Sequence, residues 1–330
     1  MSLIFKELRG TMKKRVKTKK FIVLGILSSL LIAGITWQSV MNRMEYNKYA
    51  AVGEYVDTES YKAHYYTKGN GKTAFVFITG SGTPSAYTDF YNLQNVLSTK
   101  GQTITFDHAG SGWSSDTKSE RSIENLTAEL SAIVESAAPD KSIVLLCHSL
   151  GSLEAIGFAQ AYPEKVKGII FLDTGSPEYY STYSELGARI VNRSMAFTRA
   201  VGINRMFGEC RLFLPMYGEN KRNRQLPEEL KDIDKIMYYR FAGNPSSLNT
   251  IKLINENATK VLNGKSLGDI PILVLSSDSG QKWFEVQKNL SSWSTNSKLV
   301  TIRGAEHYMY WSNNNEVVSC IDEFVEENMY

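Results

Sequence analysis

The sequence contains few cysteines and few histidines. Its 330 residues include four histidines and three widely separated cysteines, Cys147, Cys210 and Cys320. An odd number of isolated cysteines gives neither a disulfide framework nor a C-x-x-C metal or redox pattern. The sequence also lacks a dinucleotide-binding glycine motif and a cluster of metal-ligand residues. We therefore expect chemistry that uses neither a cofactor nor a metal ion.

Positive charge is scarce beyond the first 20 residues. Residues 1–20 carry a net charge of +7, whereas the whole chain carries +3. The other 310 residues therefore sum to −4. The body of the protein lacks the basic surface that a nucleic-acid-binding domain needs, so we expect no nucleic acid among its partners.

An uncharged run follows the basic segment directly. Residues 21–37, FIVLGILSSLLIAGITW, contain no charged side chain, and this length is at the short end of the range that spans a bilayer. No A-x-A cleavage pattern follows, which favours a transmembrane signal anchor over a cleaved signal peptide or a basic amphipathic surface helix. Lys and Arg residues that flank a transmembrane segment stay on the cytoplasmic side of the membrane. We expect residues 1–20 to form a basic cytoplasmic tail and residues 38–51 a linker to a membrane-anchored, extracytoplasmic domain.

The rest of the chain alternates between short apolar runs and helical patterns. Residues 73–78 and 142–147 are too rich in apolar side chains for half-exposed strands, so both of their faces should be covered. Residues 121–137 place apolar side chains at helical spacing. The alternation predicts an α/β fold with a mostly parallel eight-stranded sheet and helices on both faces. Residues 52–176 and 269–330 should form this core.

The alternation stops between the sixth and seventh strands. Residues 177–268 show no strong strand signal, and we expect a mainly helical cap above the carboxyl ends of the strands. Its apolar side chains line an apolar pocket for small or medium acyl esters or form the core of the cap itself. They are Tyr179, Tyr180, Tyr183, Phe197, Met206, Phe207, Phe213, Met216, Tyr217, Met237, Tyr238, Tyr239 and Phe241.

The stretch VLLCHSLGSLEA, residues 144–155, passes from an apolar run through a sharp turn into a helical pattern. Ser149 stands in this turn in the pattern C-x-S-x-G, which differs at one position from the nucleophile elbow G-x-S-x-G. Cys147 is small enough to replace the first glycine. A serine hydroxyl is a weak nucleophile without a base, an acid that orients the base and donors for the oxyanion. We therefore expect these groups at the ends of other strands.

His307 is the candidate base, because it follows the last predicted strand in the sequence GAEH. The other histidines fit less well: His64 is in an early strand, His108 follows Asp107, and the side chain of His148 should point elsewhere from the turn. The candidate oxyanion donors are the backbone N–H groups of Ser81, in the glycine-containing loop TGSG, and of Leu150.

These motifs together resemble the α/β-hydrolase fold superfamily. Besides CHSLG and GAEH, the loop FDHAGSGWSS at residues 106–115 is similar to the D-x-x-G-x-G-x-S signature after the fourth strand, and YPEKVKGIIFLD is similar to the segment before the sixth strand. The resemblance covers about residues 52–328. It implies a cofactor-free serine hydrolase fold with a cap.

The acid of the triad has two candidates. Many relatives carry it in a loop after the seventh strand, where this chain has Asp278, about two residues early. Some branches carry it after the sixth strand, where Asp173 ends GIIFLD. Branches with a D-x-A-G-x-G-W-S loop, which this chain resembles, often lack an Asp after strand seven. We prefer Asp173, keep Asp278 as the alternative, and expect Asp107 to hold its own loop through backbone N–H groups.

The resulting prediction is a serine hydrolase that cleaves a carboxylic ester or similar small-molecule acyl substrate through a Ser-His-Asp triad and an acyl-enzyme. A serine at the elbow argues against dehalogenase or epoxide-hydrolase chemistry. Two alternatives stay open: a receptor-like protein without activity, and an aminopeptidase-type peptidase whose cap captures the substrate amine. The carboxylates available for that capture are Glu178, Glu185, Glu209, Glu219, Glu228 and Glu229.

Overall fold

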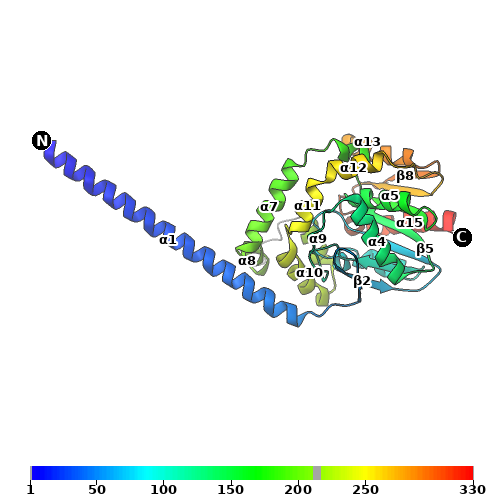
Figure 1. Ribbon diagram of the computed structural model, residues 1–330, viewed down its shortest axis with the longest axis horizontal. Helices are drawn as coiled ribbons and strands as arrows, with labels where there is room; N and C mark the ends of the chain where they lie inside the picture. Colours follow the sequence, from blue (N-terminus) through cyan, green and yellow to red (C-terminus); the bar gives the residue numbers. More distant parts are fainter. Residues whose placement is uncertain (1, 211–216, 330) are drawn as a thin grey trace.

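An eight-stranded sheet forms the centre of the domain that follows the first 50 residues (Figure 1). The computed structural model describes residues 2–210 and 217–329, so Phe213 and Met216 of the expected cap lie outside the described residues. The strands are β1 (Glu54–Asp57), β2 (Lys62–Lys68), β3 (Thr73–Ile78), β4 (Gln102–Phe106), β5 (Ser142–His148), β6 (Val166–Leu172), β7 (Ile272–Ser276) and β8 (Ser297–Thr301).

The strand order is β1-β2-β4-β3-β5-β6-β7-β8. β1 and β2 are antiparallel to their neighbours, whereas β3 to β8 run parallel to one another. The prediction of a mostly parallel eight-stranded sheet is confirmed. β4 lies on one side of β3 and β5 on the other, so the connection from β3 to β4 and the connection from β4 to β5 run in opposite directions along the sheet. Ligands of open parallel sheets bind at the carboxyl ends of strands beside such a switch point.

Helices cover both faces of the sheet, as expected. Alternate residues of β3 face opposite ways: Val76 and Ile78 belong to one buried cluster, and Phe75 and Phe77 to the other. α4, α5 and α12 contribute to the first cluster, and α3, α14 and α15 to the second. The helices of the core are α2 (Ala86–Asp89), α3 (Tyr91–Leu97), α4 (Ile123–Ala137), α5 (Gly151–Ala161), α13 (Gln281–Lys288), the 3₁₀ helix η1 (Asn289–Trp293), α14 (Met309–Ser312) and α15 (Asn314–Met329).

The segment between β6 and β7, residues 177–268, is here called the cap segment. Its described residues form helices and no strand. α12 belongs to the packing of the core, because Ile254, Ala258 and Val261 are buried in the same cluster as α4 and α5. The helices are α6 (Pro177–Ser181), α7 (Leu186–Ala200), α8 (Ile203–Glu209), α9 (Tyr217–Gln225), α10 (Glu228–Phe241), α11 (Pro245–Lys252) and α12 (Ile254–Leu262).

A buried ionic network joins the cap segment to the core. Arg222 of α9 donates to Asp89 of α2 at 2.9 Å and to Asp234 of α10 at 2.7 Å. Tyr310 of α14 donates its hydroxyl to the second carboxylate oxygen of Asp89 at 2.9 Å. All these side chains are buried, and a buried charge is tolerated only when it is paired and hydrogen-bonded. The network therefore fixes α9 and α10 against the core.

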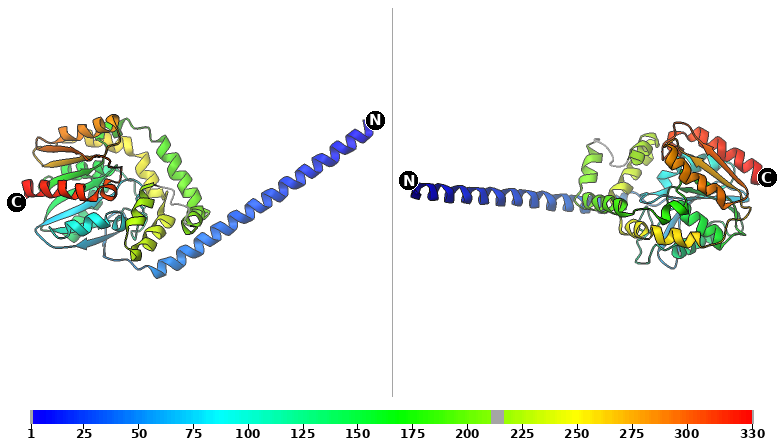
Figure 2. Two further views of the ribbon diagram at one scale, coloured as in Figure 1. Left: turned by 180° about the vertical axis from the view of Figure 1, so that it is seen from behind. Right: turned by 90° about the horizontal axis from the view of Figure 1, so that it is seen from above.

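The long helix α1 (Ser2–Lys48) projects from the domain (Figures 1 and 2). Within it, Lys17–Glu45 is long and apolar enough to cross a membrane, a test that a signal sequence also passes. The expected linker at residues 38–51 is wrong for most of its length, because the helix continues and buries Gln38 and Glu45 against the cap segment. The physical reason is the buried Arg205 of α8, which donates to the Gln38 side chain at 2.9 Å and to the Glu45 carboxylate at 2.8 Å.

Candidate active site

Ser149 occupies the turn between β5 and α5. Its φ of 52° lies in the left-handed region, which residues other than glycine adopt at a cost in strain and which is common at functional sites. The neighbouring backbone approaches closely: a Cβ added at Gly80 would lie 3.0 Å from the Cβ of Ser149. A Cβ added at Gly151 would lie 3.0 Å from the carbonyl oxygen of Thr79. The turn therefore has the tight geometry of a nucleophile elbow.

Cys147 packs in the core at the position where the elbow motif has its first glycine. Its side chain is fully buried in the cluster that α4 and α5 share, and its thiol donates to the carbonyl oxygen of Ile170 at 3.7 Å. Burial raises the pKa of the Cys147 thiol well above its usual value, so the thiol stays protonated and unreactive. Cysteine acts here as a small apolar residue.

His307 lies in the loop between β8 and α14, and its imidazole is 41% exposed. Its Nδ1 lies 2.7 Å from Oδ2 of Asp173, which directly follows β6. Because an ionised carboxylate only accepts hydrogen bonds, Nδ1 carries the proton and Nε2 is left free to accept one. Asp173 also has a left-handed φ, of 49°. The structure thus brings two of the predicted residues together.

Four donors surround the fully buried Asp173 carboxylate. Besides His307, they are the Ser277 N–H at 2.7 Å, the Trp283 indole N–H at 3.0 Å and the Gln287 amide at 2.6 Å, all three on Oδ1. Burial alone would raise the pKa of Asp173, but His307, Ser277 and Gln287 outweigh it and hold the pKa below its usual value. The carboxylate is therefore ionised and held in one orientation.

Asp278, the alternative acid, lies elsewhere. Its side chain is exposed, and its carboxylate accepts the N–H of Gly304 at 3.3 Å. Of the two candidate acids, the one that contacts His307 is Asp173.

His148 also contacts His307, although the sequence suggested that its side chain points elsewhere. Its Nε2–H donates to the carbonyl oxygen of His307 at 3.1 Å, and the two ring centroids are 4.5 Å apart. Burial, and then the charge of His307, lower the pKa of His148 to about 3. A neutral His148 can support the loop of His307 without placing a second positive charge beside it.

The two expected oxyanion donors lie beside the same turn. Within the described residues, neither the Ser81 N–H nor the Leu150 N–H has a protein acceptor. Leu150 is the residue that precedes α5, where the helix dipole favours negative charge. Both residues line a cavity of about 60 Å³. Two free N–H groups beside a strained serine can bind the oxygen of a carbonyl group.

Comparison with known proteins places this geometry in a family. The family model for the alpha/beta hydrolase fold matches residues 73–314, which include the elbow, His307 and both candidate acids. The chain belongs to the α/β hydrolase fold family.

The proteins that this chain matches are distant from it in sequence. The uncharacterized protein YbdG of Bacillus subtilis (strain 168) is 26% identical over 278 residues, which are 82% of this chain and 83% of the relative. A cis-3-alkyl-4-alkyloxetan-2-one decarboxylase of Shewanella oneidensis is 31% identical over 118 residues, 35% of this chain and 36% of the relative. The structure of an esterase from Exiguobacterium antarcticum has a TM-score of 0.65 and 14% identity, with 83% of this chain and all of that chain covered.

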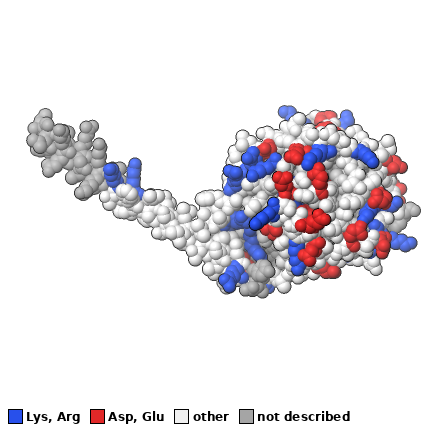
Figure 3. Space-filling view, viewed as in Figure 1, with Lys and Arg blue, Asp and Glu red and all other residues white. Residues whose placement is uncertain are grey.

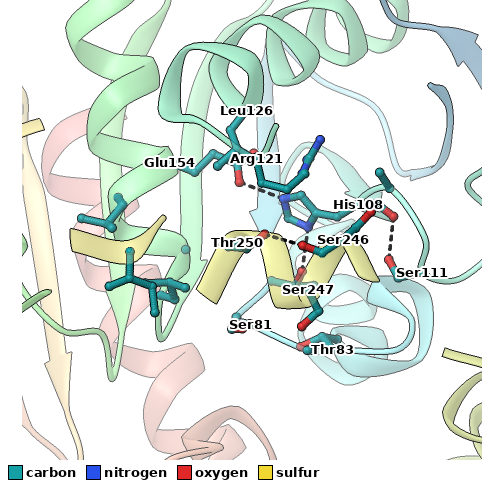
Figure 4. Close-up of a pocket in the computed structure, with 18 of the residues that line it drawn as sticks. Ser81, Thr83, His108, Ser111, Arg121, Leu126, Glu154, Ser246, Ser247 and Thr250 are labelled. Atoms are coloured by element: carbon teal, nitrogen blue, oxygen red, sulfur yellow. Dashed lines mark hydrogen bonds and ion pairs between the residues drawn. The ribbon is translucent and has the colours of Figure 1, made fainter. Parts of the chain in front are cut away.

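Polar and apolar side chains both line the cavity in this α/β hydrolase (Figure 4). His108 lies at its centre, with Nδ1 3.1 Å from the Thr79 hydroxyl and Nε2 2.8 Å from the Glu154 carboxylate. Ser246 and Ser247 of α11 also line the cavity. No aromatic side chain among the described residues of the cap segment lines this cavity. Tyr238 and Tyr239 instead pack in a separate buried cluster of the cap segment, in agreement with the alternative that the cap aromatics form its own core. In the described residues, no group of three His, Cys, Asp or Glu side chains could hold a metal ion.

Tyr180 of α6 is a site residue that the sequence did not single out. Its ring packs over Gly175, where an added Cβ would lie 2.6 Å from the ring. Burial raises the pKa of Tyr180, and hydrogen bonds with the Gly175 backbone and the Ser149 side chain oppose this rise. The phenol is therefore neutral and within hydrogen-bonding reach of Ser149. Its only signal in the sequence is its place among the cap aromatics.

A substitution at Gly80 should test how closely the loop after β3 must approach the elbow. In Gly80→Ala, the new methyl group would stand 3.0 Å from the Cβ of Ser149 and 3.1 Å from Nδ1 of His148, so the loop must move. We expect kcat for an ester to fall by about 10²-fold, because displacements near 1 Å misalign reacting groups. The control is Gly187→Ala, where no atom lies within 4 Å of the added Cβ. Equal rates for the two variants would show that the loop does not need this approach.

Proposed function

We propose that this α/β hydrolase is a serine hydrolase that cleaves a carboxylic ester or similar acyl substrate, with Ser149 as nucleophile, His307 as base and Asp173 as acid. The observation that supports this most is the 2.7 Å contact between His307 Nδ1 and the buried Asp173 carboxylate. It leaves the exposed side of the imidazole able to accept a proton. The left-handed turn at Ser149 is the second support.

The first half of the reaction forms an acyl-enzyme. His307 Nε2 takes the proton of the Ser149 hydroxyl as Oγ attacks the carbonyl carbon of the ester. The carbonyl oxygen becomes an oxyanion, and the N–H groups of Ser81 and Leu150 stabilise it. When the carbon–oxygen bond to the leaving alcohol breaks, His307 gives the proton to that alcohol. Asp173 stabilises the imidazolium that exists between these two transfers.

The second half returns the enzyme to its starting state. Water attacks the acyl carbon while His307 accepts its proton, and the same two N–H groups hold the second oxyanion. The bond to Ser149 Oγ then breaks, and the serine regains its proton from His307. The products are a carboxylic acid and an alcohol, and every proton passes through one imidazole.

The acyl group that this site accepts should be short. The cavity beside Ser81 and Leu150 has a volume of about 60 Å³. An engineered cavity of about 150 Å³ holds benzene, so the smaller cavity here favours an acyl group of a few heavy atoms. We therefore infer a short-chain ester as the substrate class.

Two related substrate classes deserve a direct comparison with esters. The decarboxylase relative acts on an alkyloxetan-2-one, a cyclic ester with the same carbonyl group. A peptidase would need a carboxylate for the substrate amine, and Glu178 offers one, because its Oε2 is buried without a partner two residues before Tyr180. Lactones and amino-acid amides are therefore the informative competitors.

A substrate panel tests the proposal. The purified full-length protein is assayed with p-nitrophenyl acetate, p-nitrophenyl octanoate, a lactone and alanine p-nitroanilide. We expect ester turnover, with kcat/KM for the acetate at least about tenfold above that for the octanoate, because an overlong chain does not fit the cavity. Turnover of the anilide without ester turnover would favour the peptidase. A protein inert to the whole panel and to a fluorophosphonate probe would favour the receptor-like role.

A further inference from the structure

Helix α7 exposes apolar side chains and buries a polar one, the reverse of a helix on a water-exposed surface. Leu186, Ile190, Val191 and Phe197 are between 55% and 62% exposed. Asn192, in contrast, is 5% exposed and donates to the hydroxyl of Ser247 on α11 at 3.2 Å. Leu186, Ile190 and Phe197 are spaced four and seven residues apart and therefore share one side of α7. An exposed apolar stripe of this kind marks a surface for contact with a membrane or another protein.

The carboxyl end of α7 meets α1 where the apolar run of α1 ends. A Cβ added at Gly34 would lie 2.3 Å from the carbonyl oxygen of Val201, which directly follows α7. A Cβ added at Gly202 would lie 3.3 Å from the ring of Trp37. Residues 21–40 of a helix rise by about 30 Å, the thickness of the hydrocarbon core of a bilayer. The cap segment therefore touches α1 within the last two turns of the stretch that would cross the bilayer, close to one membrane surface.

The orientation of α7 relative to α1 agrees with a position at the membrane surface. α7 runs across α1 rather than alongside it, and it forms the edge of the domain that faces the amino-terminal part of α1 (Figures 1 and 2). If α1 spans a bilayer, α7 lies parallel to the membrane surface. Its exposed side then faces the lipid around α1. Such a placement is typical of an interfacial amphipathic helix.

The charges near α1 agree with this arrangement. Figure 3 shows the shaft of α1 without charge between the basic side chains near its amino end and a group of Lys and Arg side chains at the adjacent edge of the domain. Lys17, Lys19 and Lys20 are exposed at the first of these places, and Arg193 is exposed on α7. Arginine beside apolar side chains suits a surface of anionic lipid headgroups.

We propose that the cap segment rests on the lipid bilayer, with the apolar side of α7 formed by Leu186, Ile190 and Phe197 in contact with lipid on the extracytoplasmic side. The hydrogen bonds of Arg205 with Gln38 and Glu45 fix α1 to the cap segment, so the domain has one orientation on the membrane. The turn 182–185 alone separates α7 from α6, which carries Tyr180 beside Ser149. The candidate site therefore stands close to the membrane surface.

Fluorescence in nanodiscs tests this placement without any need for catalysis. Full-length protein with Cys210 and Cys320 replaced by serine receives one new cysteine, in Ile190→Cys or Phe197→Cys, and an NBD label. The buried Cys147 is retained. The matched control is Glu326→Cys, an exposed position of α15 at the far end of the domain. The nanodiscs contain phosphatidylcholine and phosphatidylglycerol, with or without doxyl-labelled lipid.

We expect blue-shifted NBD emission at both α7 positions and loss of most of this emission with doxyl-labelled lipid, while the Glu326→Cys label behaves as in water. Emission at the α7 positions equal to that of the control would overturn the proposal. A blue shift that doxyl lipid does not quench would also overturn it, because protein, such as a second copy of the chain, would then cover α7. Circular dichroism of each labelled protein establishes that it is folded.

Discussion

Ser149→Ala is expected to lower kcat for p-nitrophenyl acetate by about 10⁶-fold, the loss found when a serine hydrolase is deprived of its nucleophile. The reason is that Tyr180, the other hydroxyl in contact with Ser149, has a pKa raised by burial and stays protonated. His307 is then left without a nucleophile to activate. The same variant should lose covalent labelling by a fluorophosphonate, which requires the attack of Oγ on phosphorus. Steady-state rates and mass spectrometry of the labelled protein measure the two effects.

Ser292→Ala is the matched control, because Ser292 is exposed on η1 and donates only to the nearby Asn289 carbonyl at 2.7 Å. It should keep both the esterase rate and the label. Thermal unfolding of the two variants separates lost chemistry from lost structure. A Ser149→Ala protein that is folded and still turns over the ester at the wild-type rate would disprove the role of Ser149.

Much of the fold followed from the sequence because parallel strands are buried on both faces. TAFVFI and SIVLLC stand out as apolar runs, and they form β3 and β5 with nearly every side chain buried. The residues that follow such strands share one edge of the sheet. Ser149, His307 and Asp173 could be proposed as one site for that reason, and the structure brings His307 and Asp173 into contact. The helices α2, α3 and α13 have four, seven and eight residues, too few for a repeating apolar pattern to indicate a helix, and were not predicted.

The surroundings of Asp173 could not be read from the sequence. Trp283 and Gln287 lie on α13, more than 100 residues further along the chain, and reach Asp173 only because β6 and β7 are neighbours. Nothing in QKWFEVQK marks a side chain that faces a buried carboxylate. The linker after the apolar run was mispredicted for a similar reason. Gln38 and Glu45 look like solvent-facing residues until Arg205, about 160 positions later, is placed beside them.

Electrostatics favour Asp173 over Asp278 as the acid of the proposed triad. An imidazolium next to a buried, ionised carboxylate is stabilised more strongly than one next to an exposed carboxylate, because water screens the exposed charge. Asp173 is fully buried and its pKa is held low in spite of burial. Asp278 is exposed and 3.3 Å from the Gly304 N–H that it accepts. The neutral His148 leaves the pair undisturbed by a second positive charge.

Asp173→Asn is expected to lower kcat for the ester by about 10⁴-fold, the loss seen when a triad aspartate becomes an amide. The amide oxygen should take the position of Oδ1, where three donors converge from Ser277, Trp283 and Gln287. The amide NH₂ must then face Nδ1 of His307 and donate to it. The imidazole adopts the tautomer with its proton on Nε2, which cannot accept a proton from Ser149.

Asp278→Asn provides the comparison, because it makes the same chemical change at the other candidate acid. It should keep a rate close to wild type, since the exposed amide can still accept the Gly304 N–H. The pH profile adds a readout that mere destabilisation would not give: in Asp173→Asn, the remaining activity should rise toward alkaline pH, where hydroxide replaces the missing base. A large loss in Asp278→Asn together with normal rates in Asp173→Asn would reverse the assignment of the acid.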